Sequence, residues 1–212
     1  MQIGIIGAGN VGRALAEASA RAGHAVSISS TDPADAQRAA ADVGGSAAAS
    51  NEQAVAKAEV VILAVPFDAI RAIVDELGSQ LAGTVLVDVT NRFAPEQLDG
   101  SSNAELTHQM APAARVVKAF NTILAAHQAD PVVDGIQLDG VVAGDDAEAK
   151  ANVLELVASL GFRPIDAGPL SMSRALEGMA LLNIALNMTN GWPWQTGWKL
   201  LGPTGRSAEA GT

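Results

Sequence analysis

The chain opens with a short apolar segment that runs directly into a glycine-rich turn. Residues 2–6 are mostly apolar, and Gly7, Gly9 and Gly12 follow at the spacing Gly-x-Gly-x-x-Gly. The next stretch, residues 13–21, is rich in helix-forming residues. Glycines at this spacing also occur in ordinary turns. A strand, a glycine turn and a helix in this order, however, are the fingerprint of a dinucleotide-binding unit.

Each glycine of this motif has a separate task in a dinucleotide-binding turn. Gly7 lets the chain turn sharply out of the strand, Gly9 leaves room for a pyrophosphate, and Gly12 lets the helix pack on the sheet. The phosphates would then lie at the N-terminus of the helix, where unpaired N–H groups and the helix dipole favour negative charge. The predicted cofactor-binding turn comprises Gly7, Ala8, Gly9, Asn10, Val11 and Gly12.

Apolar runs that predict strands alternate with helical stretches along the chain. The expected strands are residues 2–6, 25–29, 47–49, 59–65, 84–89, 115–120, 140–143 and 163–166. The expected later helices are residues 33–43, 52–57, 67–81, 104–110, 147–160 and 171–188. This alternation predicts an α/β fold with a Rossmann-type doubly wound parallel sheet. We expect a dinucleotide-binding domain, residues 1–125, and a small, closely packed C-terminal α/β domain, residues 126–212.

The composition excludes several kinds of site. The chain has no cysteine, which rules out disulfides, thiolate metal sites and a cysteine nucleophile. Its net charge of −10 argues against nucleic-acid binding. No apolar run reaches the roughly 18 residues of a membrane span. We expect a cytoplasmic protein that binds a small molecule and has no metal site.

The apolar helix over residues 171–188 packs on the sheet or on a second subunit, and we expect a homodimer.

The segment after the second predicted strand sets the choice between NAD and NADP. It carries three hydroxyls, those of Ser29, Ser30 and Thr31, and they favour NADP. Asp32 could hold a ribose as in NAD enzymes, but Pro33 directly after it favours a helix N-cap instead. Arg38 either reaches a 2′-phosphate or lies solvated on the helix surface.

Three segments in the second half of the chain resemble a known family. They are Val-Val-Lys-Ala-Phe-Asn-Thr-Ile at 116–123, Val-Ala-Gly-Asp-Asp at 142–146 and Asp-Ala-Gly-Pro-Leu-Ser-Met-Ser-Arg at 166–174. Together with the glycine motif they resemble the NADPH-dependent coenzyme F420 reductases over nearly the whole chain. The first two are also similar to the reductase domain of the STEAP metalloreductases. The resemblance implies a Rossmann domain that presents the nicotinamide of NADP to a second flat redox ring, with F420 as the expected co-substrate.

This chain departs from the pattern of the F420 reductases at a few positions. Thr31 stands where the family commonly has an arginine that grips the 2′-phosphate. Asn121 stands where characterised members have a histidine beside the deazaflavin. Three tryptophans are additional to the pattern, Trp192, Trp194 and Trp198. They either stack on a planar substrate or hold the C-terminal segment or a dimer contact.

Direct hydride transfer between two stacked rings depends on proximity and asks little of side chains, so we expect no catalytic residue. Ligands of parallel sheets bind at the carboxyl ends of the strands. Val65 and Pro66 end one such strand and are expected to wall the nicotinamide. The residues expected to line the pocket of the second ring are Asn121, Thr122, Ile123, Leu170, Ser171 and Ser173, the last three through the resemblance.

Two other functions are compatible with the same residues. One is an NAD(P)H-dependent reductase of a small carbonyl or imine, in which Lys118 or a water supplies the proton. A lysine in an apolar strand is, however, expected to turn outward or to be paired. The chain has no tyrosine, which excludes the Tyr-Lys relay of short-chain dehydrogenases. The other function is a dinucleotide-binding sensor without turnover.

Overall fold

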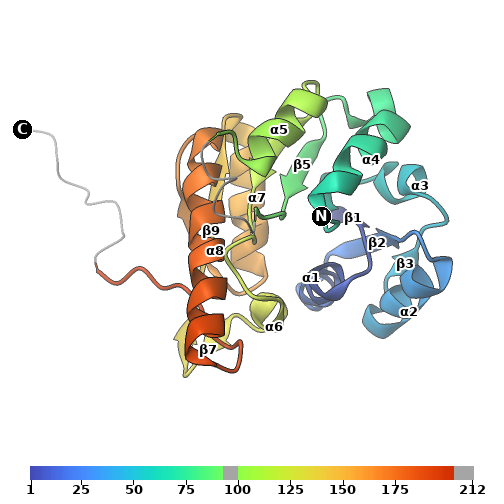
Figure 1. Cartoon of the computed structure of the whole chain (residues 1–212). Helices are drawn as coiled ribbons and strands as arrows, with labels where there is room; N and C mark the ends of the chain where they lie inside the picture. Colours follow the sequence, from blue (N-terminus) through green and yellow to red (C-terminus); the bar gives the residue numbers. More distant parts are fainter. Residues whose placement is uncertain (93–99, 203–212) are drawn as a thin grey trace, which may run out of the picture.

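The computed structural model describes residues 1–92 and 100–202 (Figure 1). Within these ranges one sheet of eight strands has the order β10-β9-β6-β5-β4-β1-β2-β3. The strands of this sheet are β1 (Gln2–Ile6), β2 (Ala25–Ser29), β3 (Ser46–Ala47), β4 (Val60–Leu63), β5 (Val85–Asp88), β6 (Arg115–Lys118), β9 (Asp139–Gly144) and β10 (Arg163–Asp166). β1 through β6 pair in parallel, which confirms the predicted Rossmann-type sheet.

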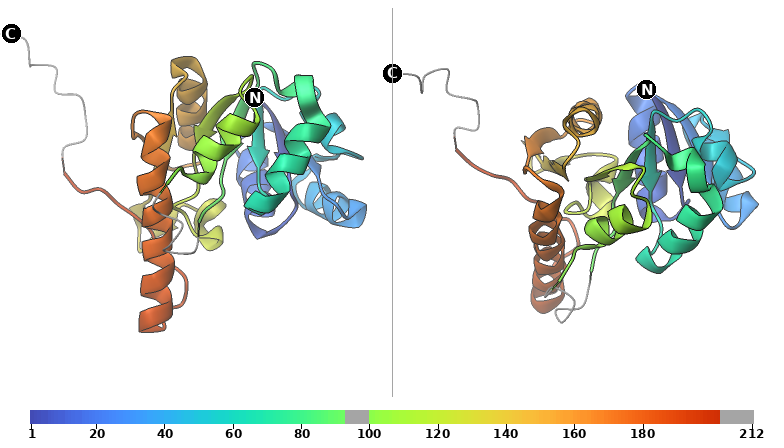
Figure 2. Two further views of the ribbon diagram at one scale, coloured as in Figure 1. Left: turned by 45° about the horizontal axis from the view of Figure 1, so that its top comes forward. Right: turned by 90° about the horizontal axis from the view of Figure 1, so that it is seen from above.

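Helices cover both faces of the sheet (Figure 2). They are α1 (Asn10–Arg21), α2 (Pro33–Val43), α3 (Asn51–Val55), α4 (Ile70–Leu77), α5 (Asn103–Met110), α6 (Ala125–Gln128), α7 (Ala147–Ser159) and α8 (Ser173–Asn190). Successive strand residues point to opposite faces. On β4, Val60 and Ile62 join an apolar cluster with α1, α2 and α7, whereas Val61 and Leu63 join a second cluster with α4 and α5. This two-sided burial explains why the strand is continuously apolar.

One junction of the sheet is antiparallel, which the sequence analysis did not predict. β9 pairs with β6 in antiparallel register, with Lys118 opposite Ala143, and β10 is parallel to β9. A parallel return needs a long crossover, usually a helix packed along the sheet. Between β6 and β9 the chain makes only the short α6 and a hairpin of β7 (Val132–Val133) and β8 (Ile136–Gln137), which the sequence did not predict. The chain therefore turns back at the carboxyl edge of β6.

Several predicted elements differ from the structure only at their ends. The helix expected over residues 67–81 is α4 flanked by two short 3-10 turns, Phe67–Ala69 and Gly78–Leu81. Asp32 caps α2, as predicted, because its carboxylate accepts a hydrogen bond from the N–H of Ala34 at 2.9 Å and Pro33 is the first helical residue. β9 and β10 continue the main sheet, and the division into two domains near residue 125 stays a prediction.

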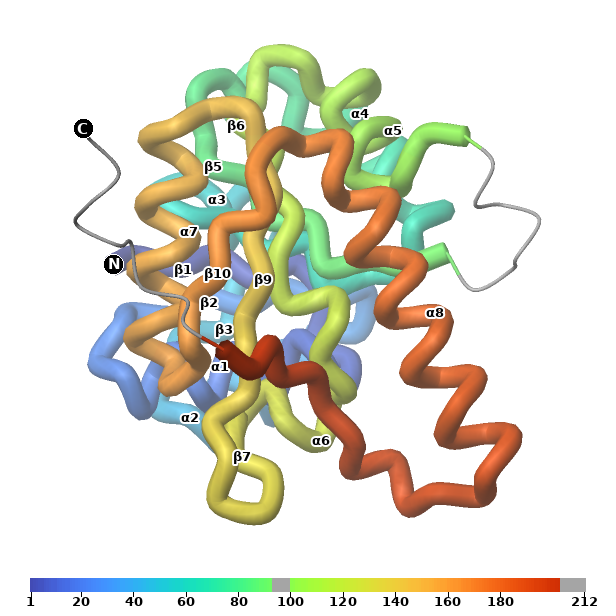
Figure 3. The backbone as a smooth tube through the Cα atoms, turned by 90° about the vertical axis from the view of Figure 1, so that its left-hand side faces the viewer, coloured from blue at the N-terminus to red at the C-terminus, as the bar shows by residue number. Residues whose placement is uncertain are grey.

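α8 stands at the edge of the molecule, and the chain after it runs back toward β9 (Figure 3). The carboxylate of Asp139 on β9 accepts hydrogen bonds from the N–H of Leu200 at 2.7 Å and from Lys199 at 3.0 Å. Trp198 joins this attachment through its carbonyl, whereas Trp192 and Trp194 are 42% and 45% exposed. No described helix combines the length and the apolar character that a membrane crossing requires.

Candidate cofactor site and the buried polar cluster beside it

The three glycines of the turn between β1 and α1 differ in what surrounds them. Two are required by packing, and the third faces open space. Gly7 has a φ of +109°, and an added Cβ there would overlap the carbonyl of Ala64. A Cβ on Gly12 would overlap the carbonyl of Gly7. At Gly9, by contrast, an added Cβ meets no atom within 4 Å and the backbone is extended. Packing therefore requires glycine at the first and third positions, whereas the second leaves room for something outside the chain.

A cavity of about 510 Å³ lies against this turn, at the carboxyl ends of β1, β2 and β4. Its volume is in the range of ordinary small-molecule sites. Seven of the predicted cofactor residues line it: Gly7, Ala8, Gly9, Ser30, Thr31, Val65 and Pro66. The sequence reasoning missed Asn51 and Glu76, which also line it from α3 and α4. The donors at the start of α1 and the small residues of the turn suit the pyrophosphate of a dinucleotide.

The hydroxyls after β2 do not all face this cavity. Ser29 is 1% exposed, and its hydroxyl donates to Oδ1 of Asn51 at 2.7 Å. Nδ2 of Asn51 in turn donates to Glu76 at 2.8 Å. Ser29 thus orients a neighbour, and only Ser30 and Thr31 are left beside the cavity. Arg38 lies on α2 outside the cavity lining, with its side chain 60% exposed.

The segment after β6 is buried and tied to the segment after β5. Asn121, Thr122 and Ile123 are 5%, 3% and 7% exposed. Asn91 donates through Nδ2 to the carbonyl of Asn121 at 2.9 Å, and Asn121 donates through Nδ2 to Oδ1 of Asn91 at 2.8 Å. Oδ1 of Asn121 is buried and has no partner among the described residues. Asn91 was not among the predicted site residues, since no local pattern marks it.

The other candidates for the second ring lie where η4 (Leu170–Met172) leads into α8. Leu170 and Ser173 are buried, and the hydroxyl of Ser173 lies 2.5 Å from that of Ser102 at the start of α5. Ser171 is exposed. None of these residues, and none of residues 121–123, lines the cavity at the glycine turn. Most of the residues predicted to bind the cofactor therefore lie around one cavity. The pocket predicted for the second ring is not part of that cavity and stays a proposal.

Lys118 is paired rather than turned outward. Its side chain is fully buried at the end of β6. Nζ donates to Asp88 at 3.1 Å, to the carbonyl of Thr90 at 2.5 Å and to Glu177 on α8 at 2.7 Å. These three acceptors match the three N–H bonds of an ammonium group. Lys118 in this arrangement has no N–H left to give to a substrate.

The cluster around Lys118 holds two carboxylates against one ammonium. Asp88 also accepts hydrogen bonds from Thr107 and from both the N–H and the hydroxyl of Thr90. Glu177 accepts one from the N–H of Asn103 at 2.9 Å, and its Oε2 is buried without a partner among the described residues. Burial raises the pKa of Glu177, although Lys118 opposes that rise. Burial at this position therefore favours the protonated form of the Glu177 carboxyl group.

Comparisons with known proteins place the chain in a family. Residues 2–92 match the family model for NADP oxidoreductases that are coenzyme F420-dependent. The F420-dependent NADP reductase of Methanothermobacter marburgensis is 31% identical over 211 residues, which cover 90% of this chain and 94% of that protein. Metalloreductase STEAP3 of Rattus norvegicus is 38% identical over 183 residues, which cover 85% of this chain but only 36% of that protein.

A solved structure supports the same assignment. The crystal structure of a candidate F420-dependent NADP reductase from Arthrobacter sp. FB24 has a TM-score of 0.85 and 30% identity, and the match covers 95% of this chain and 100% of that one. The similarity thus includes β9, β10 and α8 as well as the glycine turn. The chain belongs to the family of NADP-dependent oxidoreductases that includes the F420-dependent NADP reductases.

Proposed function

We propose that this protein transfers a hydride between NADP(H) and coenzyme F420. The observation that carries the proposal is the open side of Gly9, which faces the cavity of about 510 Å³ in a chain that matches F420-dependent NADP reductases over nearly its whole length. Neither the backbone conformation of Gly9 nor its packing within the chain requires a glycine there. Close approach of a pyrophosphate does require one.

In this proposal some residues hold the dinucleotide and others position the two rings. The glycine turn and the start of α1 would hold the pyrophosphate, and Val65 and Pro66 would wall the nicotinamide. NADPH supplies the hydride when it is bound. Residues 121–123, with Leu170, Ser171 and Ser173, would line the pocket of the second ring. The proton that completes the two-electron reduction of F420 can come from water, so the side chains only position the rings.

The proposal is tested by following NADPH oxidation with separate acceptors under anaerobic conditions. The acceptors are F420, FMN, FAD and a panel of small carbonyls and imines. We expect F420 to give the highest kcat/KM by a wide margin. Turnover of flavins or carbonyls without F420 activity would refute the proposal. Binding of NADPH by calorimetry without turnover of any acceptor would indicate a sensor instead.

We also propose that the protein is a cytoplasmic homodimer that uses α8. Large apolar side chains are exposed on this helix and just beyond it: Leu182 is 49%, Met188 69% and Trp192 42% exposed. Exposed apolar surface of this kind is typical of an interface. Sedimentation equilibrium should give twice the mass of the chain, and Met188→Glu should shift the equilibrium to monomer. A monomeric wild-type protein at micromolar concentration would refute this part.

A further inference from the structure

Two arginines from different helices converge on one carboxylate of α2, the helix that follows the cavity residues Ser30 and Thr31. Nη2 of Arg13, on α1, lies 3.0 Å from Oδ1 of Asp35. Nη2 of Arg38, on α2, lies 2.6 Å from the same oxygen. Arg38 was the only nearby cation that the sequence suggested, because Arg13 and Asp35 are separated by the whole of β2. Folding therefore brings two guanidinium groups to a place where the sequence suggested only one.

Arg13 is held over the glycine turn. Its Nε donates to the carbonyl of Ala8 at 2.7 Å, and Ala8 lines the cavity. Asp35 belongs to the first turn of α2, four residues after Thr31, which lines the same cavity. The arginine pair is thus tied to the pyrophosphate turn through Ala8 and to the helix after β2 through Asp35, and we call this place the rim; neither arginine lines the cavity itself. In Rossmann enzymes that segment contacts the adenosine ribose and discriminates NADP from NAD.

The ion pairs at this rim are open to competition from another anion. The side chains of Arg13, Asp35 and Arg38 are 37%, 38% and 60% exposed. Exposed ion pairs of this kind contribute little, commonly ~0–1 kcal/mol. A phosphate dianion binds guanidinium groups through short, charge-assisted and often bidentate hydrogen bonds, which are stronger. Asp35 carries one negative charge and the two arginines carry two positive charges, so the three side chains together have a net charge of +1.

We propose that Arg13 and Arg38 together bind the 2′-phosphate of NADP(H), and that Asp35 is the competing anion that holds them when the phosphate is absent. In this arrangement Arg13 supplies the positive charge near the 2′-phosphate, because Thr31 has an uncharged side chain. Asp35 lowers the affinity for NADP, since the phosphate must displace it from both guanidinium groups. NAD, which has a hydroxyl at this position, gains nothing from the arginine pair. The inference rests on the NADP part of the proposed function and is independent of F420.

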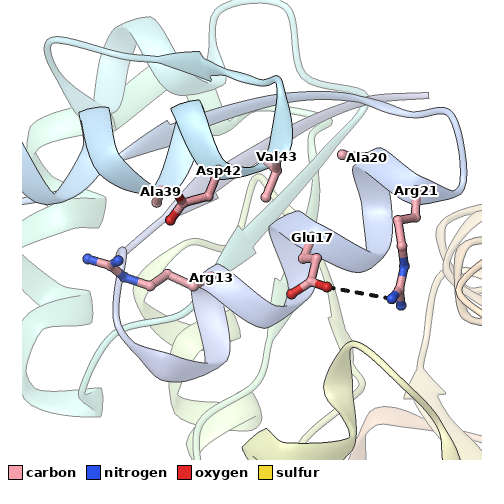
Figure 4. Close-up of a pocket in the computed structure, with 7 residues that line it drawn as sticks. All are labelled: Arg13, Glu17, Ala20, Arg21, Ala39, Asp42 and Val43. Atoms are coloured by element: carbon pink, nitrogen blue, oxygen red, sulfur yellow. Dashed lines mark ion pairs between the residues drawn. The ribbon is translucent and has the colours of Figure 1, made fainter.

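Figure 4 supplies a matched control on the same helix. It shows Arg13 reaching from the start of α1 away from the pair formed by Glu17 and Arg21 further along α1. Arg21 is 56% exposed and lies 3.5 Å from Glu17. These three residues line a separate cavity of about 410 Å³ between α1 and α2, which does not include the glycines of the turn. Arg21→Ala therefore removes an exposed, ion-paired arginine from α1 without touching the rim.

The test measures the Kd values of NADP⁺ and NAD⁺ by calorimetry for the wild type and four variants. We expect Arg13→Ala and Arg38→Ala each to weaken NADP⁺ binding by about tenfold or more, as loss of a charged hydrogen bond does. NAD⁺ binding should stay within about twofold, because its hydroxyl carries no charge to lose. Asp35→Asn should tighten NADP⁺ binding severalfold and leave NAD⁺ unchanged. Arg21→Ala should alter neither Kd.

The binding measurements can overturn the inference in three ways. If Arg13→Ala weakens both cofactors equally, Arg13 only supports the glycine turn through Ala8. If neither arginine variant changes NADP⁺ binding, the rim holds ordinary surface ion pairs. Weaker NADP⁺ binding by Asp35→Asn would assign Asp35 a supporting role. Absence of F420 turnover with intact discrimination would refute the proposed function alone, and F420 turnover with equal use of NADP and NAD would refute this inference alone.

Discussion

Replacement of Lys118 by methionine should destabilise the protein severely. Methionine has a similar length and removes only the charge and the three hydrogen bonds. Asp88 and Glu177 would then be left at 0% and 1% exposure without their ammonium partner. Removal of one partner from a buried ion pair costs about 3–5 kcal/mol, because the remaining charge is uncompensated. We expect a loss of this size in the free energy of unfolding at pH 7.

The structure indicates which carboxylate carries most of that cost. Asp88 keeps hydrogen bonds from Thr90 and Thr107 after the substitution. Glu177 keeps only the N–H of Asn103, while its Oε2 already lacks a partner among the described residues. The double variant Lys118→Met/Glu177→Gln removes the worse of the two charges. It should therefore recover a large part of the lost stability.

The assay is urea denaturation followed by circular dichroism between pH 5 and pH 8. Burial raises the folded-state pKa of Glu177 above its ordinary value of 4.5, so the native state binds the proton more tightly than the unfolded state. Its contribution is therefore lost as pH rises above 4.5. Lys118→Met should steepen that decline, and Glu177→Gln should flatten it.

Lys57→Met, at an exposed lysine, is the control and should change stability by less than about 0.5 kcal/mol. A loss below about 1 kcal/mol for Lys118→Met, or no recovery in the double variant, would refute the reasoning.

Three further outcomes follow from the same contacts. Gly9→Ala should leave the unfolding free energy unchanged, since its Cβ meets nothing, but weaken NADP⁺ binding by about tenfold, whereas Gly100→Ala should change neither in the same calorimetric titrations. Asn121→Ala should raise the KM for F420 or lower kcat in steady-state assays while the Kd of NADPH stays near the wild-type value; a weakened Kd alone would contradict the assignment. A hydrogen bond from Arg174 lowers the pKa of Glu105 from its ordinary value of 4.5 to about 2. The stabilising contribution of this carboxylate is therefore present above pH 4.5 and is lost as the pH falls toward 2. The stability difference between the wild type and Glu105→Gln should accordingly shrink in acid denaturation, and a constant difference would contradict it.

Features that depend on neighbouring residues were predictable from the sequence. The glycine turn, the apolar strands and the Asp32 cap are each set by residues a few positions apart, through backbone sterics, side-chain period and local hydrogen bonding. The sequence also predicted that Ser30, Thr31, Val65 and Pro66 would meet at one edge, because parallel strands bring their carboxyl ends together. These local rules determined the fold class and the cofactor side of the site.

Contacts between distant segments were decided only by the tertiary structure. The Lys118–Glu177 pair joins residues 59 positions apart, and the Asn91–Asn121 pair joins residues 30 positions apart. The Arg13–Asp35 pair and the antiparallel junction of β6 with β9 are likewise absent from any local pattern. Strand order, crossover length and helix placement fix which side chains meet, and these are properties of the packed chain as a whole. The sequence by itself therefore determined which elements form, while packing decided which charges they bring together.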